Sequence, residues 1–224
     1  MGTYTKIIEF YGLPGCGKTT LCRRLKDLYV DKGFRVGLLP DAVTDFRWKY
    51  LFLKLSFREI ILYTRFIHKL KKYRVHKNLV LSVIRRFLIY KSARVHSKYD
   101  YVFIDHGVVQ SIVRALYDTP CPIDLLRTTV FREMLSATFV EGIIHCDISS
   151  KEAYNRVRIR NRKNSGTFDQ FSDEALKMVL DGHVPIFESI ESILIEFNKN
   201  IFTIDCNCEI ERCVSQVEQY MLNE

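Results

Sequence analysis

Short apolar runs alternate with longer amphipathic stretches along this chain of 224 residues. Runs rich in β-branched and aromatic residues predict five strands, at residues 6–11, 36–39, 101–104, 143–146 and 201–204. Helical periodicity fills the intervals, where Gly33 ends one helix and Ser172, followed by two acids, begins a long one. Strands that alternate with helices are typical of a parallel sheet with helices on both faces, so the pattern predicts an α/β fold.

The length suits one domain over residues 1–224, because two separate cores need a longer chain. The first residues lack a basic segment followed by an apolar one, and no run of about 18 apolar residues occurs, so we expect a cytoplasmic protein without a transmembrane segment. The seven cysteines lie mostly in apolar or helical contexts, which favours free thiols over structural disulfides. The spacing of Cys206 and Cys208 is not that of a zinc site.

Positive charge is concentrated in residues 46–98. This segment holds 15 Lys and Arg against a single acid, Glu59, whereas the whole chain carries a net charge of +8. Apolar residues at helical spacing, such as Phe66, Leu70 and Phe87, predict two or three amphipathic helices inserted between the second and third strands. The basic residues are either a solvated face of core-packed helices or a surface for an anionic partner, such as nucleic acid or a lipid head group. The sequence leaves both interpretations open.

A glycine-rich loop lies between the first strand and the first helix. Residues 12–19 read Gly-Leu-Pro-Gly-Cys-Gly-Lys-Thr and match the pattern G-x-x-x-x-G-K-[ST] in its expected context. Glycines let successive backbone N–H groups face an anion, and the helix N-terminus adds partial positive charge. The motif predicts binding of ATP or GTP and a three-layer αβα P-loop NTPase fold, with a five-stranded parallel sheet and a helical insertion. The expected nucleotide-binding residues here are Gly12, Gly15, Cys16, Gly17, Lys18, Thr19 and Thr20.

Lys18, Thr19 and two aspartates are candidates for the chemistry of phosphoryl transfer. We expect Lys18 to reach the β and γ phosphates and the Thr19 hydroxyl to hold Mg²⁺. Asp105 ends the third strand and is a second expected Mg²⁺ ligand, although such an aspartate also commonly caps the next helix. Asp41 follows the second strand, where a carboxylate can accept a hydroxyl proton, and a plain turn aspartate is the alternative. Either Asp41 or Asp105 would act as the base.

Four arginines fall at every second position after the fourth strand: Arg156, Arg158, Arg160 and Arg162. Alternate positions of a helix lie on different faces, so these arginines do not form a simple amphipathic stripe. The pattern favours an arginine-rich lid over residues 156–170 that stabilises the transferring phosphoryl group and excludes water. Its catalytic candidates are Arg158 and Arg162, and a solvated basic turn is the alternative.

These residues resemble the nucleoside and nucleotide kinases of the P-loop superfamily, especially thymidylate kinases and deoxynucleoside kinases. Residues 105–107, Asp-His-Gly, stand where the family has its acidic motif, and residues 147–156 resemble the segment that leads to its lid. Residues 204–207 stand at the adenine-contacting loop, so the resemblance implies that Asn207 binds the nucleotide. Asp41, with Trp48 beyond it, is similar to the Glu-Pro-Val and tryptophan segment of deoxynucleoside kinases, in which the acid is the base for the sugar hydroxyl.

The first hypothesis is therefore an Mg²⁺-requiring kinase that transfers the γ-phosphoryl group of ATP to a nucleoside, a nucleotide or a related small molecule. A second hypothesis keeps this chemistry but assigns a lipid or polynucleotide acceptor bound by the basic helices. A third is a nucleotide-dependent ATPase switch or binding module. The Asn-Lys-x-Asp motif of common GTPases is missing from the sequence, which disfavours a GTPase of that kind.

Overall fold

The structure is a computed structural model and describes residues 5–39, 56–75, 77–96, 98–117, 122–137, 140–161, 171–197 and 199–222. Its centre is a sheet of five parallel strands in the order β2-β3-β1-β4-β5. The strands are β1 (Lys6–Tyr11), β2 (Val36–Leu38), β3 (Tyr101–Ile104), β4 (Gly142–Asp147) and β5 (Ile201–Asp205). All five coincide with the predicted apolar runs to within one residue at either end.

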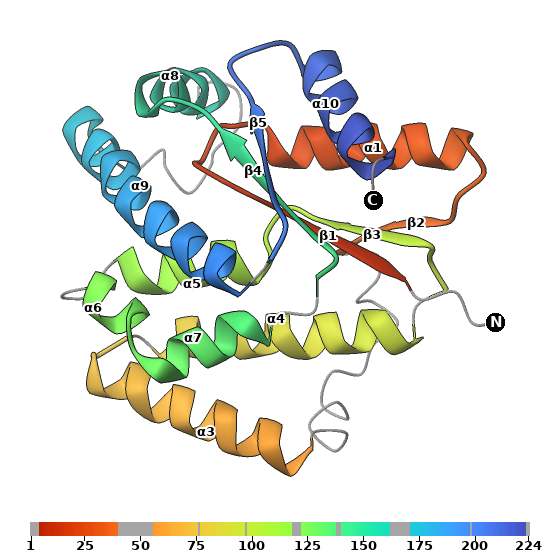
Figure 1. The fold of residues 1–224 in the computed structure, drawn as a ribbon. Helices are drawn as coiled ribbons and strands as arrows, with labels where there is room; N and C mark the ends of the chain where they lie inside the picture. Colours follow the sequence, from red (N-terminus) through yellow and green to blue (C-terminus); the bar gives the residue numbers. More distant parts are fainter. Residues whose placement is uncertain are drawn as a thin grey trace.

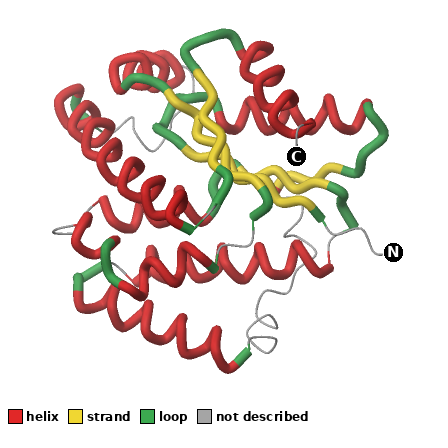
Figure 2. Tube along the Cα trace, in the orientation of Figure 1, coloured by secondary structure: helices red, strands yellow, loops and turns green. Residues whose placement is uncertain are grey.

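Helices cover both faces of the sheet (Figures 1 and 2). On one face lie α1 (Lys18–Asp31) and α10 (Ile210–Leu222), and on the other lie α4 (Lys77–His96), α5 (Val108–Tyr117) and α9 (Asp173–Glu196). This arrangement confirms the three-layer αβα fold. Outside the second face lie α3 (Phe57–Lys72), α6 (Pro122–Leu126) and α7 (Thr129–Ser136), and α8 (Ser150–Asn161) lies near the carboxyl ends of the strands.

The register of the parallel strands brings their carboxyl ends together at one edge. Ile8 of β1 lies opposite Phe103 of β3 and opposite Gly142 of β4. Strand β1 is central, and Ile7, Ile8 and Phe10 are buried because both of its faces are covered. Loops that follow β1, β3, β4 and β5 therefore meet above the same edge, where open α/β sheets bind ligands.

The basic segment contains two long helices in its described part, as predicted. A capping box starts α3: the Ser56 hydroxyl accepts from Glu59 N, and the Glu59 carboxylate accepts from Ser56 N. Phe66 and Leu70 face the core from α3, and Phe87 is fully buried on α4. The domain boundaries proposed from the sequence stay a prediction.

Ser172 begins α9, as the sequence predicts, since its hydroxyl accepts a hydrogen bond of 3.2 Å from Ala175 N. Among the described residues, none of the helices combines the length and the apolar character that a bilayer crossing requires.

Candidate active site

The phosphate loop connects β1 to α1 in a conformation that requires glycine. Gly12 and Gly17 have φ angles of 145° and 95°, which L side chains rarely adopt. A Cβ on Gly12 would also lie 2.5 Å from the Cys146 carbonyl oxygen of β4. Lys18 is the first residue of α1, so the loop ends at a helix N-terminus, where backbone N–H groups and the helix dipole favour an anion.

The Lys18 ammonium is folded into this loop. Its Nζ donates to the carbonyl oxygens of Gly12 at 2.8 Å and Leu13 at 2.9 Å, and it lies 3.2 Å from Cys16 Sγ. Burial opposes ionisation of the Cys16 thiol, but a hydrogen bond from Cys146 and the nearby Lys18 ammonium outweigh it and lower the pKa of this thiol. The hydrogen bonds to Gly12 and Leu13 thus hold the positively charged end of Lys18 against the phosphate loop.

Thr19 and Asp105 meet at the edge of the sheet. Thr19 Oγ1 donates a hydrogen bond of 2.6 Å to Asp105 Oδ2, although the residues lie 86 positions apart in the chain. Hydroxyl and carboxylate oxygens are the ligand types that Mg²⁺ prefers, with water and phosphate oxygens completing its shell. This pair therefore fits the predicted Mg²⁺ site. Within the described ranges, no group of three or more His, Cys, Asp or Glu side chains could hold a metal ion by itself.

A buried glutamate positions the loop that carries Asp105. Glu9 of β1 accepts hydrogen bonds from Tyr90 Oη at 2.8 Å and from Val109 N at 2.7 Å, at the start of α5. Burial outweighs these hydrogen bonds and raises the pKa of Glu9 to about 7. A Cβ on Gly107 would lie 1.9 Å from Tyr90 Oη, so only glycine fits there. The sequence analysis did not identify Glu9, although a lone acid inside an apolar strand was a usable signal.

Gln110 and His106 complete the junction between β3 and α5. Gln110 Oε1 accepts a hydrogen bond of 3.2 Å from Gly12 N, which ties α5 to the phosphate loop. Partial burial lowers the pKa of His106, and the negative charge of Asp105 opposes this shift without cancelling it. The positive charges of Lys18, Arg86 and Arg114 lower the pKa further. His106 is thus neutral at pH 7, and two arginines from α4 and α5 supply positive charge near it. Neither arginine was a candidate from the sequence.

Helix α8 packs on the phosphate loop through Ala153 and through Arg156, the first residue of the predicted lid. A Cβ on Gly15 would lie 2.9 Å from the Ala153 carbonyl oxygen and 3.5 Å from Arg156 Cβ. Arg156 therefore lies beside the loop, where its Nε donates to Glu152 at 2.8 Å. The first part of the predicted lid is regular helix up to Asn161. Arg160 is exposed on it.

Arg158 points toward the start of α9. Its Nη2 donates to the Phe171 carbonyl oxygen at 2.9 Å and lies 2.7 Å from Asp173 Oδ1. The guanidinium also stacks over the Tyr154 ring, 5.5 Å from its centroid. These contacts join the end of α8 to the beginning of α9. Arg162 lies outside the described residues, as do Asp41, Trp48 and the rest of the lid up to residue 170.

The other predicted nucleotide-binding residues lie at the same edge. Thr20 is exposed on the first turn of α1, next to Thr19. Asn207 is exposed in the loop after β5, where its N and Nδ2 donate to Asp205 Oδ1 at 2.9 Å and 2.8 Å. The hydrogen bonds give this loop a defined shape. The contact of Asn207 with the nucleotide base stays a prediction.

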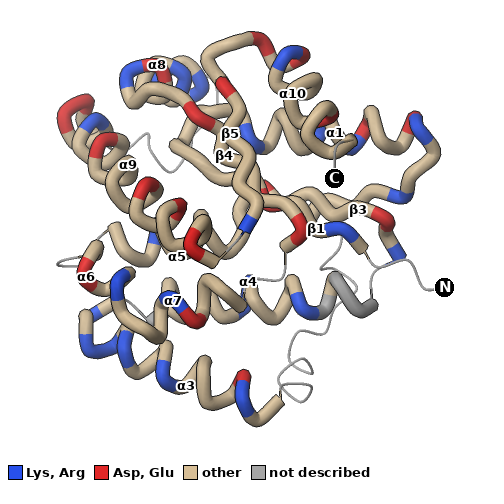
Figure 3. The backbone as a smooth tube through the Cα atoms, in the orientation of Figure 1, with Lys and Arg blue, Asp and Glu red and all other residues tan. Residues whose placement is uncertain are grey.

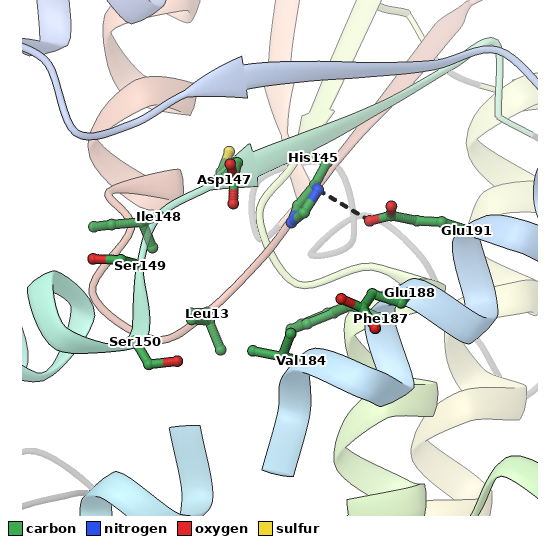
Figure 4. A pocket seen from close by; sticks show the side chains of 11 residues that line it. Leu13, His145, Asp147, Ile148, Ser149, Ser150, Val184, Phe187, Glu188 and Glu191 are labelled. Carbon is green, nitrogen blue, oxygen red and sulfur yellow. Dashed lines mark ion pairs between the residues drawn. The ribbon is translucent and has the colours of Figure 1, made fainter. Parts of the chain in front are cut away.

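A pocket of about 300 Å³ opens beside the phosphate loop, between the end of β4, the start of α8 and one side of α9 (Figure 4). Its polar lining includes Asp147, Glu188 and Glu191, with His145 Nδ1 lying 3.0 Å from Glu191 Oε1. Tyr11 Oη donates to the same carboxylate at 2.7 Å. Leu13, Val184 and Phe187 supply apolar lining. The carboxylates make this pocket unsuited to phosphate groups but suited to hydroxyl or amino groups.

Comparisons with known proteins agree with this geometry at the level of the fold. No family model matches the chain, and no curated protein matches it either. Among solved structures, a deoxyadenosine kinase from M. mycoides with bound dATP matches with a TM-score of 0.53 at 14% identity, covering 97% of this chain and 100% of that one.

Two further structures of deoxyadenosine kinase from M. mycoides are similar to the chain. The one with bound dCTP gives a TM-score of 0.53 at 13% identity, covering 97% of this chain and 100% of that chain. The one with the products dcmp and a flexible dcdp gives 0.51 at 13% identity and 97% of each chain. Together with the phosphate loop and the strand order, these matches show that the chain has the P-loop fold of the deoxynucleoside kinases.

Proposed function

We propose that this protein is a kinase that transfers the γ-phosphoryl group of ATP to a hydroxyl group of a nucleoside or a related small molecule. The observation that carries the proposal is the phosphate loop at the N-terminus of α1, with the Thr19 hydroxyl held 2.6 Å from the Asp105 carboxylate. Phosphoryl transfer needs positioning and neutralisation of charge more than covalent chemistry by the protein. This edge of the sheet supplies both.

The phosphate loop and Lys18 would bind the triphosphate. The backbone N–H groups at the start of α1 favour the phosphate charge, and the Lys18 ammonium exchanges its contacts with the Gly12 and Leu13 carbonyls for phosphate oxygens. Thr19 and Asp105 would hold Mg²⁺, which neutralises charge on the phosphates when it is bound. Arg156 lies against Gly15 and is the described α8 arginine best placed to stabilise the phosphoryl group.

The hydrogen bond between Thr19 and Asp105 supports a division of labour between the two candidate bases. Asp105 is hydrogen-bonded to Thr19 at the proposed metal position, which leaves Asp41, of the two candidate bases, to accept the proton of the acceptor hydroxyl. Asp41 lies outside the described residues, so its role rests on its sequence position after β2. Arg162, which also lies outside the described residues, stays a candidate for stabilising the transferring phosphoryl group.

The charges around the site favour an unphosphorylated acceptor. Asp147 and Glu188 line the pocket beside Leu13, and they would repel the phosphate of a nucleotide while accepting hydrogen bonds from hydroxyl groups. The similar solved structures are named deoxyadenosine kinases, which supports a nucleoside acceptor. A deoxynucleoside is therefore the first acceptor to test.

The experiment is a measurement of ADP release by the purified chain with ATP and Mg²⁺ across deoxynucleosides, ribonucleosides, nucleotides and amino sugars. We expect acceptor-dependent ADP release that is strongest with a nucleoside, and a phosphorylated product in the mass spectrum. Lys18→Ala is the control that should abolish turnover. ADP release that no acceptor stimulates would contradict the proposal and favour the ATPase switch.

A kinase that acts on an anionic lipid or a polynucleotide is the second candidate, and the surface of α3 favours it. Lys and Arg positions recur along α3 (Figure 3), and exposed Arg58, Lys71 and Lys72 share the helix with Phe57, whose residue surface is 79% exposed. Binding to anionic vesicles or RNA that weakens steeply with salt, together with phosphorylation of that partner, would favour this candidate. Binding that is missing even at low salt would remove it.

A further inference from the structure

Five cysteines form a row of sulfur contacts that runs from the phosphate loop to the surface. Cys146 of β4 contacts both Cys16 of the phosphate loop and Cys206 at the end of β5. Cys213 of α10 contacts Cys206 and Cys208 in turn. Four of the five thiols are buried, and Cys208 is partly exposed. Cys22 on α1 is also buried, and the charge of Cys16 contributes to the raised pKa of its thiol.

The outer end of the row is a pair of thiols in near contact. Cys208 Sγ lies 3.6 Å from Cys213 Sγ, and both sulfurs lie close to the Asp205 carbonyl oxygen, at 3.0 Å and 3.5 Å. A disulfide has an S–S length of about 2.05 Å, so the sulfurs need to approach by about 1.5 Å. Cys208 belongs to the loop before α10, where a side-chain rotation can supply part of this movement.

We propose that Cys208 and Cys213 are a modification site, at which they form a reversible intramolecular disulfide. The oxidant is a low-molecular-weight disulfide such as oxidised glutathione. The Cys208 thiolate, which solvent can reach, attacks one sulfur of the oxidant and releases one glutathione thiolate. Cys213 then attacks Cys208 in this mixed disulfide and releases the second thiolate. The two protons of the protein thiols end on glutathione, so two electrons pass from the protein to the oxidant.

The closing step is controlled by the burial of Cys213. Burial, together with the neighbouring sulfurs of Cys206 and Cys208, raises the pKa of the Cys213 thiol well above its usual range. Little of this thiol is ionised near neutral pH, so the closing step is slow there and becomes faster as the pH rises. A reversible disulfide of this kind differs from the structural disulfides that the sequence disfavours.

The disulfide would change the loop that is expected to contact the nucleotide base. When the disulfide forms, both sulfurs lose their hydrogen atoms and with them their hydrogen bonds to the Asp205 carbonyl oxygen. Asp205 also accepts both hydrogen bonds of Asn207 through its side chain, so a shift of Asp205 moves Asn207. A weaker affinity for ATP in the oxidised chain follows, and this consequence rests on the proposed function. The disulfide itself does not.

The test exposes the full chain to glutathione buffers of increasing oxidised fraction, blocks the free thiols and measures intact mass. We expect one disulfide per chain that dithiothreitol reverses. Trypsin cuts after Lys199 and Arg212, so the disulfide joins the peptide of residues 200–212 to that of residues 213–224. Because Cys206 and Cys208 lie on the same peptide, three serine variants assign the partner.

Cys208→Ser and Cys213→Ser should each remove the link between these peptides, whereas Cys206→Ser should keep it. Cys22→Ser is the matched control for a buried thiol outside the row and should also keep it. A link that survives in Cys208→Ser and disappears in Cys206→Ser overturns the proposal, as does oxidation that stops at a mixed disulfide on Cys208 or joins other cysteines. All of these measurements are of mass, so they test the disulfide whether or not the protein is a kinase.

Discussion

Thr19 Oγ1 and Asp105 Oδ2 are joined by a hydrogen bond of 2.6 Å that links the first turn of α1 to the end of β3. The contact places a hydroxyl from the phosphate loop beside the carboxylate of a neighbouring strand. Oxygen ligands from these two positions are what an Mg²⁺ ion bound to phosphates requires. The fold thus brings together the two side chains of the proposed metal site.

Substitution of Thr19 tests this arrangement. We expect Thr19→Ala to lower kcat about 100-fold, because it removes one preorganised ligand from the site of charge development. Thr19→Ser keeps the hydroxyl and is the matched control, with an expected loss of less than about threefold. The measurement is steady-state turnover as a function of Mg²⁺ concentration. Equal activity in the alanine and serine variants would remove Thr19 from the metal site.

Much of the fold could be predicted from the sequence because its signals are local. The strands are short apolar runs, and the helix that begins after Ser172 has a capping residue and acids in its first turn. The phosphate loop is specified within residues 12–19, since its glycines, lysine and threonine are adjacent in the chain. Such features need no knowledge of what lies across the sheet.

The parts that escaped prediction depend on long-range contacts. Glu9 is paired with Tyr90, 81 positions away, and no local pattern relates them. The arginine-rich stretch makes Arg158 a catalytic candidate, but the side chain of Arg158 points toward the start of α9, where it forms an ion pair with Asp173. Spacing along the chain could not show that Arg156, not Arg158, packs beside Gly15. The assignment of catalytic roles to these arginines stays a prediction.

Gly12→Ala should impair both folding and nucleotide binding. The new methyl group meets the Cys146 carbonyl oxygen at 2.5 Å, and the φ angle of 145° disfavours any side chain. We expect a loss of at least about 2 kcal/mol in the free energy of unfolding and a large loss of ATP affinity. Denaturant unfolding and calorimetric titration with ATP measure the two effects.

Gly33→Ala is the matched control for this substitution. Gly33 also has a positive φ angle, 88°, but nothing lies within 4 Å of its would-be Cβ, and it ends α1 away from the loop. Gly33→Ala should lower the free energy of unfolding by about 1 kcal/mol from backbone strain alone and leave the ATP affinity unchanged. If Gly33→Ala weakened ATP binding as much as Gly12→Ala, strain rather than the loop would explain the loss.

Glu9 predicts a dependence of stability on pH near neutrality. Its pKa rises from 4.5 to about 7 in the folded protein. The contribution of Glu9 to the free energy of unfolding is therefore fully present below pH 4.5 and is lost as the pH rises through 7. The shift corresponds to about 3 kcal/mol in the free energy of unfolding. Glu9→Gln cannot ionise and should lack this contribution to the pH dependence. Urea unfolding between pH 5 and about 8.5 measures the difference, and identical slopes for the two proteins would contradict the assignment.

Arg156 and Arg158 should have separable effects although both lie on α8. Arg156→Ala removes the guanidinium of a side chain whose Cβ lies beside Gly15, so we expect turnover to fall at least about 10-fold with little change in stability. Arg158→Ala breaks the contacts with Phe171 and Asp173 and should lower the free energy of unfolding by about 1 kcal/mol. Arg160→Ala, at an exposed position, is the control for loss of positive charge. Turnover and thermal unfolding of the three variants distinguish the two roles. A larger loss of turnover in Arg158→Ala than in Arg156→Ala would instead indicate that Arg158 is the catalytic arginine.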